Sequence, residues 1–310
     1  MQPIINPIDR TLLKQELNAD RFIRVTNNGN NEIYIITHHD SPNTMLEIGR
    51  LREVTFRAAG GGTGKECDID HFDTDSVCYK QLIVWNKEEE EIVGGYRFIR
   101  CGDVLDYNKQ EAKLATSGLF NFSAQFVKEY MPKTIELGRS FVQPKFQPGV
   151  DSRKGLFALD NIWDGLGSLI VDNPDINYFF GKVTMYLDFN QEARDMILYF
   201  LKTFFPDQES LMHPFNPMPL HTAEEKLSLI FKGLDYKEAF KALNTNVRAL
   251  GENIPPLINS YMNLSPTMRT FGTSLNEHFG DVEETGILVT LKDMYESKVG
   301  RHINTYTKGN

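Results

Sequence analysis

Hydrophobic positions follow two spacings along the chain, the period of two typical of strands and the period near 3.6 typical of helices. The first part predicts a short helix, two strands around the turn NNGNN, and a long helix that begins at Ser41-Pro42 and stops before Gly60. The apolar face of the long helix carries Leu46, Ile48, Leu51, Val54 and Phe56. The expected bounds of these elements are 9–17, 22–26, 32–39 and 41–59.

The middle of the chain reads as strands interrupted by helices. Two β-rich runs, SVCYKQLIVW and EIVGGYRFI, flank the charged turn NKEEEE and predict an antiparallel hairpin. A short helix, a strand, a helix, a strand and an apolar helix follow at 121–131, 134–142, 153–171, 177–187 and 190–205. After Pro206 the pattern is mostly helical over 222–263, and two strands, MRTFG and GILVTL, come last. Because helix and strand mix without strict alternation, we expect an α+β fold with a largely antiparallel sheet.

Composition narrows the class of protein. Hydrophobic residues make up 41% and charged residues 24% of the 310 residues, which is ordinary for a soluble globular chain. The net charge of −9 argues against general nucleic-acid binding, which needs a dominant cationic face. Three scattered cysteines without CxxC spacing argue against a disulfide framework or a zinc site. No apolar run approaches 18 residues, and the first residues lack a signal-peptide pattern, so we expect a cytoplasmic protein without a bound metal.

The run GGGTGKE at 60–66 is similar to a phosphate-binding loop but lacks its key positions. Ala59 stands where the first glycine of such a loop belongs, and Glu66 stands where Ser or Thr would hold magnesium. The run also follows a helix rather than a strand. We therefore interpret it as a mobile glycine-rich loop.

Acidic residues are dense in the stretch CDIDHFD at 67–73. The stretch lacks the glycine and terminal glutamate of a calcium-binding EF-hand loop. Ile69 and Phe72 alternate with the acids, which indicates carboxylates fixed by packed neighbours. An ammonium-bearing substrate or an arginine partner would suit them.

The strand ELGRSFV at 136–142 carries charges on both faces. With strict alternation, Glu136, Gly138 and Ser140 share one face, and Leu137, Arg139 and Phe141 share the other. Charges on a central strand need partners, so this pattern by itself favours a structural ion pair over catalysis.

Seven segments in order resemble one family: LREVTF, DIDHFD, GGYRFI, ELGRSFV, LDNIWDGLGSLI, IPPLINSYMNL and FGTSLNEHFGD. They resemble the hemolysin-like N-acyltransferases of the GNAT superfamily that form ornithine or glycine lipids. The first four are also similar to acyl-homoserine-lactone synthases, which are shorter and lack the Pro-Pro segment. The likeness spans about 45–295.

The resemblance implies a GNAT-like fold, a splayed mixed sheet flanked by helices, formed by residues 1–310 as one domain with a mostly helical insertion at about 206–265. It implies transfer of a fatty acyl group from an acyl carrier protein thioester, or from acyl-CoA, to the α-amine of glycine or ornithine. The product is a lyso-aminolipid, and no bound cofactor or metal is implied. The positions that match those used by the related synthases are Arg52, Phe56, Asp70, Asp73, Arg97, Glu136 and Arg139.

Within this picture Glu136 and Arg139 are the expected catalytic residues, and Arg52, Phe56 and Arg97 are expected to bind substrate. Glu136 is the expected base for the ammonium, because a carboxylate in a partly apolar site has a raised pKa. Asp70 and Asp73 are expected to pair with arginines and shape the pocket. The thioester is expected to lie along Ser140, Phe141 and Val142, where a backbone N–H exposed by sheet splaying near 140–143 would polarise its carbonyl.

The donor's pantetheine is expected to enter near Lys145, Arg153, Lys154 and Gly155, because an acidic carrier protein needs a local cationic face on this acidic chain. The usual GNAT pyrophosphate loop is not clean in this region, which favours a carrier-protein donor over coenzyme A.

Two other function classes remain open from sequence alone. One is a non-catalytic GNAT-like module that binds acyl chains, and the other is a signal synthase that lactonises an S-adenosylmethionine acceptor.

Peripheral contact with the inner face of the membrane is the last expectation. It would run through 204–215, with Phe204, Phe205, Met212 and Phe215 exposed.

Overall fold

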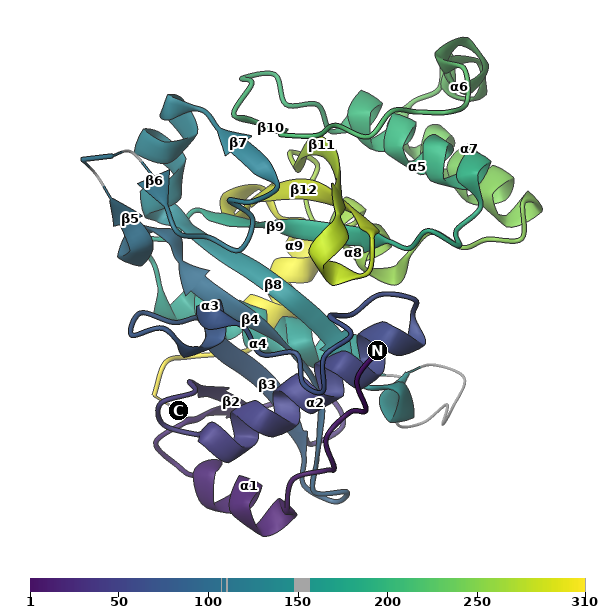
Figure 1. Cartoon of the computed structure of the whole chain (residues 1–310). Helices are drawn as coiled ribbons and strands as arrows, with labels where there is room; N and C mark the ends of the chain where they lie inside the picture. Colours follow the sequence, from purple (N-terminus) through teal and green to yellow (C-terminus); the bar gives the residue numbers. More distant parts are fainter. Residues whose placement is uncertain (107, 110, 148–156, 310) are drawn as a thin grey trace.

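A mixed eight-stranded sheet, splayed at its one parallel pair, forms the centre of the molecule (Figure 1). The computed structural model describes residues 1–106, 108–109, 111–147 and 157–309. The strands, in spatial order, are β1 (Phe22–Val25), β2 (Glu32–Ile36), β3 (Lys80–Asn86), β4 (Glu91–Arg100), β8 (Thr134–Val142), β9 (Tyr178–Met185), β12 (Val282–Thr290) and β11 (Arg269–Asn276). Neighbouring strands are antiparallel except β8 and β9, which run parallel. The expected α+β class with a largely antiparallel sheet is confirmed.

Helices cover both faces of this sheet. The α-helices of the described residues are α1 (Arg10–Glu16), α2 (Pro42–Ala58), α3 (His71–Thr74), α4 (Ala158–Asp172), α5 (Gln191–Phe204), α6 (Glu224–Phe231), α7 (Tyr236–Ala249), α8 (Pro256–Met262) and α9 (Glu296–Lys298). Leu82 and Ile83 are consecutive in β3 and point to opposite faces. Leu82 belongs to the apolar cluster that contains α4, whereas Ile83 belongs to the cluster that contains α1 and α2. The sheet is therefore buried between α2 and α4.

Two small sheets complete the strand inventory of the described residues. They pair β5 (Leu105–Asp106) with β6 (Glu111–Ala112) and β10 (Met212–Pro214) with β7 (Phe120–Phe122). Neither pair is expected from the sequence, because strands of two or three residues give too little alternation to detect. The second pair links the segment before β8 with the segment after α5.

Helices α5, α6 and α7 pack together beside β11, at the upper right of Figure 1. Phe200 of α5, Phe231 of α6 and Leu243 of α7 are buried in the same apolar cluster as α4. Helices α6, α7 and α8 occupy a little under half of residues 206–265, and their apolar residues share the main core. Their description as an insertion within a single domain of 1–310 stays a prediction.

A β-bulge interrupts β8. The pairing of β4 with β8 shifts register between Gly95 and Arg97, so that β8 carries one extra residue opposite Tyr96. Arg139 lies there with a φ of 49°, in the left-handed region that non-glycine residues rarely adopt. Such a conformation costs of order 1–3 kcal/mol and is common at ligand sites.

This bulge makes the expected alternation along β8 wrong beyond Gly138. Leu137 packs into the cluster of α4, but Phe141, four residues on, packs into the cluster of α2. One extra residue turns every later side chain to the opposite face. Arg139 consequently does not share a face with both Leu137 and Phe141.

The expected exposure at 204–215 is wrong for three of the four residues and is confirmed for Phe215. Phe205 and Met212 are buried. Phe204 is half-buried, and its ring packs edge-to-face on Tyr236. Phe215 is the one exposed member of the four, at 54%. The apolar end of α5 therefore serves packing, and membrane contact through 204–215 stays a prediction that rests on Phe215. Within the described residues, no helix is both long and apolar enough to cross a bilayer.

Candidate active site

Two aspartates and two arginines form a buried ionic cluster beneath α2. Arg52 of α2 pairs with Asp73 at 3.2 Å, and Arg97 of β4 pairs with Asp70 at 2.9 Å and with Asp73 at 3.3 Å. Burial opposes ionisation of Asp73, but Arg52 and Arg97 outweigh it and hold the pKa of that carboxyl well below its usual range. The arginine partners expected for Asp70 and Asp73 are present, and both aspartates are occupied by them.

The acidic stretch owes its shape to one helical turn. Asp70 caps α3 by accepting a hydrogen bond from the Asp73 N–H, while Asp73 accepts from the Asp70 N–H. This reciprocal capping box turns both carboxylates toward the arginines. The sequence reading treats these residues as a packed stretch and does not identify the helical turn.

Arg139 joins the same cluster because of the bulge. Its Nε lies 2.9 Å from Asp68 and its Nη2 lies 3.7 Å from Asp70. Its guanidinium carbon also lies 4.1 Å from the centroid of the Phe279 ring. Arg139 therefore has a fixed position at the inner end of the cluster, and Asp68 is a partner that the sequence reading does not identify.

Glu136 lies beside this cluster, on the part of β8 that still pairs with β9. Its side chain is 1% exposed, and its Oε2 accepts a hydrogen bond of 2.8 Å from the Tyr79 hydroxyl. Burial raises the pKa of Glu136 to about 7, against the lowering effects of the Tyr79 hydrogen bond and the charges of Arg97 and Lys182. A carboxyl with this pKa can accept a proton near neutral pH and release it again.

A cavity opens where β8 and β9 separate. The two strands pair only as far as Leu137 and Gly181, one residue beyond Glu136. A cavity of about 50 Å³ follows at once, lined by Phe56, Tyr96, Leu137, Gly138, Arg139, Ser140, Lys182, Thr184, Leu257, Tyr261, Phe279 and Glu284. Glu136 thus lies at the closed end of a wedge between two strands, and the cavity occupies the open part.

A second buried ion pair borders this cavity. Lys182 of β9 pairs with Glu284 of β12, and Glu284 also accepts a hydrogen bond of 2.9 Å from Asn276. Burial lowers the pKa of Lys182, although Glu284 opposes the shift. The cavity wall therefore combines aromatic rings with fixed charges.

The expected site residues divide into three groups. Phe56, Arg139 and Ser140 line the cavity. Glu136 does not line it but directly precedes Leu137, which does, and Arg52, Asp70, Asp73 and Arg97 form the ionic cluster. Phe141 is buried against α2, and Val142 packs on the α4 side, so neither side chain lines the cavity. Arg153, Lys154 and Gly155 lie outside the described residues.

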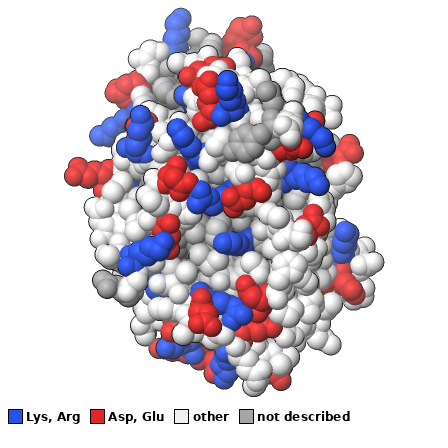
Figure 2. Space-filling view, turned by 90° about the vertical axis from the view of Figure 1, so that its left-hand side faces the viewer, with Lys and Arg blue, Asp and Glu red and all other residues white. Residues whose placement is uncertain are grey.

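Lys145 does not offer a free charge. Its ammonium lies 2.9 Å from Glu89 and 3.0 Å from Glu91. The positive charge of Lys145, expected to mark the pantetheine entrance, is therefore neutralised by these two carboxylates. On the face drawn in Figure 2, positive and negative side chains of the described residues are interspersed rather than gathered by sign.

The residues that the sequence reading does not identify are Tyr79, Lys182, Tyr261 and Glu284. Tyr79 precedes β3 and meets Glu136 from 57 residues away, and nothing local marks that contact. Tyr261 lies in the Pro-Pro segment, which serves in the sequence reading only as a family marker. The presence of Tyr261 in this family motif is the one sequence signal that could have indicated its place in the cavity wall.

The glycine-rich loop binds one of the protein's own carboxylates. Glu53 accepts hydrogen bonds from the Thr63 and Gly64 N–H groups, at 3.1 and 2.8 Å, and from the Thr63 hydroxyl. The N–H groups that a phosphate loop would offer to a nucleotide are therefore already bonded to the Glu53 carboxylate. The three cysteines are free thiols, and the described residues hold no group of three or more His, Cys, Asp or Glu side chains suited to a metal ion.

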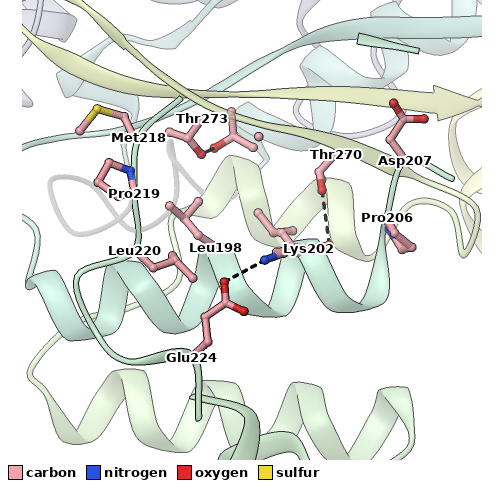
Figure 3. A pocket seen from close by; sticks show the side chains of 13 residues that line it. Leu198, Lys202, Pro206, Asp207, Met218, Pro219, Leu220, Glu224, Thr270 and Thr273 are labelled. Carbon is pink, nitrogen blue, oxygen red and sulfur yellow. Dashed lines mark hydrogen bonds and ion pairs between the residues drawn. The ribbon is translucent and has the colours of Figure 1, made fainter. Parts of the chain in front are cut away.

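Figure 3 shows a different pocket, of about 540 Å³, between α5, β11 and the chain before α6. Leu198 and the exposed ion pair between Lys202 and Glu224 lie on its α5 side, and Thr285 of β12 belongs to its wall. Thr285 and Glu284 are consecutive in β12, so their side chains point to opposite faces. This pocket is therefore not an extension of the cavity beside Glu136.

The chain is similar to several known proteins. An acetyltransferase (GNAT) domain model matches residues 51–152. The chain is 57% identical over 306 residues to a glycine N(alpha)-acyltransferase of Bacteroides thetaiotaomicron, covering 99% of this chain and 91% of that protein. It is 54% identical over 309 residues to one of Phocaeicola vulgatus, covering 99% and 94%. The crystal structure of the acyl-homoserine-lactone synthase LasI matches with a TM-score of 0.30 and 15% identity, over 49% of this chain and 71% of that one.

Proposed function

This chain belongs to the family of its glycine N(alpha)-acyltransferase relatives and is an N-acyltransferase with a GNAT domain, and we propose that glycine is its acceptor and a fatty acyl carrier protein its donor. The product is then an N-acylglycine, the lyso form of an aminolipid. The observation that carries the proposal is Glu136, a buried carboxyl with a pKa of about 7 at the closed end of the wedge between β8 and β9.

Glu136 is proposed to act as the base. The α-ammonium of glycine gives a proton to its carboxylate, directly or through a water molecule, and the free amine attacks the thioester carbon. The C–N bond forms, the C–S bond breaks, and the departing sulfur takes a proton to become the pantetheine thiol. Arg139 is assigned the role of holding the inner wall against Phe279 and Asp68, beside the reacting atoms.

The oxyanion of the tetrahedral intermediate needs a backbone N–H that no strand partner uses. The bulge at Arg139 interrupts the hydrogen-bond ladder between β4 and β8 at the cavity wall. Within the range 140–143, a backbone N–H close to the bulge therefore fits the role of oxyanion donor. Gln143 is removed from the range because its N–H already donates to Val93 at 3.0 Å.

The proposal is tested by incubating the protein with a long-chain acyl carrier protein and each of several amino acids. Mass spectrometry is expected to detect an amide with glycine in preference to ornithine. Formation of no amide with any amino acid contradicts the proposed function. Release of methylthioadenosine when S-adenosylmethionine is supplied supports a signal synthase instead.

The rate is expected to depend on pH through Glu136. Only the ionised carboxylate accepts a proton, so the reaction with glycine should accelerate as pH rises through about 7, the pKa of this buried group. An exposed glutamate would place the same rise near its ordinary pKa of about 4.3. Initial rates between about pH 5 and pH 9 distinguish the two cases, and a rate that is already constant above about pH 6 removes Glu136 from the mechanism.

The choice of donor gives a second prediction. Arg153 and Lys154 follow β8 in sequence and precede α4, and we propose that they contact the acidic carrier protein. The double change Arg153→Glu and Lys154→Glu is expected to raise the KM for acyl carrier protein by roughly tenfold, at little cost in kcat.

The matched control is Lys237→Glu, an exposed charge reversal on α7. It should leave the KM for acyl carrier protein unchanged. A short acyl-4′-phosphopantetheine thioester, which carries the phosphate without the carrier protein, separates two roles of the Arg153 and Lys154 patch, binding the phosphate and binding the carrier protein. An equal rise in KM for this small donor assigns the patch to the pantetheine phosphate and not to the carrier protein.

A further inference from the structure

The Tyr79 hydroxyl lies between a backbone donor and the Glu136 carboxylate. It accepts a hydrogen bond of 2.9 Å from the Ala115 N–H and donates one of 2.8 Å to Glu136 Oε2. The N–H can only donate, so the phenol proton must point to the carboxylate. The chain from Ala115 through Tyr79 to Glu136 therefore has one direction.

The Tyr79 ring is fixed as firmly as its hydroxyl. The residue is 0% exposed, its ring packs edge-to-face with Phe72 at 5.7 Å, and the Arg97 guanidinium carbon lies 5.1 Å from its centroid. Burial and the neighbouring Glu136 charge raise the pKa of Tyr79 well above its ordinary value, so the phenol stays protonated and remains a donor. Tyr79 thus connects the ionic cluster to the carboxyl at the closed end of the wedge.

The Tyr79 hydrogen bond affects both the charge and the orientation of the Glu136 carboxylate. A hydrogen bond to one oxygen of a buried carboxylate favours its charged form and restricts its rotation. Because Tyr79 engages Oε2, the other oxygen, Oε1, has a defined direction relative to β8.

We propose that Tyr79 is a positioning residue that holds Glu136 in its proton-accepting state and orientation, an inference that rests on the proposed role of Glu136 as base. Tyr79 itself touches neither substrate in this assignment. Its effect on the reaction passes through Glu136.

Tyr79→Phe tests the proposal through the pH profile. Loss of the donor should raise the pKa of Glu136, so the acid limb of the rate profile should move to higher pH by roughly one unit. Turnover should therefore fall about fivefold at pH 7, approach a tenfold loss at lower pH, and recover at higher pH. A merely structural role would lower the rate equally at every pH, and an unmoved limb overturns the proposal.

Tyr34→Phe is the matched control. Tyr34 is likewise a buried tyrosine, and its hydroxyl donates to Glu32 at 2.7 Å, away from the cavity. This variant should keep the wild-type limb. A shift of the same size in Tyr34→Phe would show that any lost tyrosine hydroxyl moves the profile and would overturn the proposal.

A second variant covers the case in which Tyr79→Phe fails to fold, since it leaves the Ala115 N–H without its acceptor. Fluorotyrosine at position 79 keeps the shape and makes the phenol a stronger donor, so the acid limb should move to lower pH. No movement overturns the proposal. Full activity of Glu136→Gln would instead contradict the proposed function, so the two failures are distinguishable.

Discussion

Glu136→Gln is expected to lower turnover with glycine by ~10²-fold or more while the protein stays folded. Gln has nearly the same shape and can still accept the Tyr79 hydrogen bond through its amide oxygen. It cannot take a proton from an ammonium at neutral pH. The loss should therefore appear in kcat and leave the unfolding midpoint close to that of the wild type.

The control for this change is Glu32→Gln. Glu32 also accepts a hydrogen bond from a buried tyrosine, but it lies on β2, three strands away from β8. Its substitution should leave turnover unchanged. If Glu136→Gln also keeps its rate at neutral pH, the carboxyl is not the base. If it unfolds, Glu136 has the structural role that strand ELGRSFV by itself favours.

Asp73→Asn is expected to destabilise the fold by about 3–5 kcal/mol. Arg52 and Asp73 are both 0% exposed, and the Asp73 carboxylate also compensates Arg97. The amide removes the negative charge and leaves two buried guanidinium groups undercompensated. Denaturant unfolding measures the loss, with the midpoint compared at equal slope.

Glu224→Gln serves as the control for the cluster. It breaks an exposed ion pair with Lys202, whose side chains are 57% and 65% exposed, and should cost about 0–1 kcal/mol. A loss for Asp73→Asn no larger than this would show that the cluster does not hold the core together. Its residues would then be free to bind substrate, as the sequence resemblance allows.

Most elements of the fold could be predicted because their signals are local. The helix at Pro42–Ala58 has a proline at its start, a continuous apolar face and glycines after its end. Strands β3 and β4 are long apolar runs bounded by turns, so their existence did not depend on knowing their partners.

The features that could not be predicted are those that depend on a distant partner. The bulge at Arg139 exists because β8 must stay in register with β4 on both sides of it. The Tyr79–Glu136 and Lys182–Glu284 contacts join residues 57 and 102 positions apart. Phe205 reads as an exposed helix end until β11 is known to cover it, through the Thr270 N–H that bonds to its carbonyl at 2.8 Å. Local pattern carries no information about these pairings.

The central claim is that this chain acylates the amine of glycine through Glu136, and the lipid profile of cells that produce it tests that claim most directly. Cells fed ¹⁵N-glycine and producing the wild-type chain should accumulate N-acylglycines that carry the label. Cells producing equal amounts of folded Glu136→Gln should show at most a trace of them. A new labelled amide of equal abundance in both strains would contradict the role of Glu136, and a new amide of another amino acid in its place would contradict glycine as the acceptor.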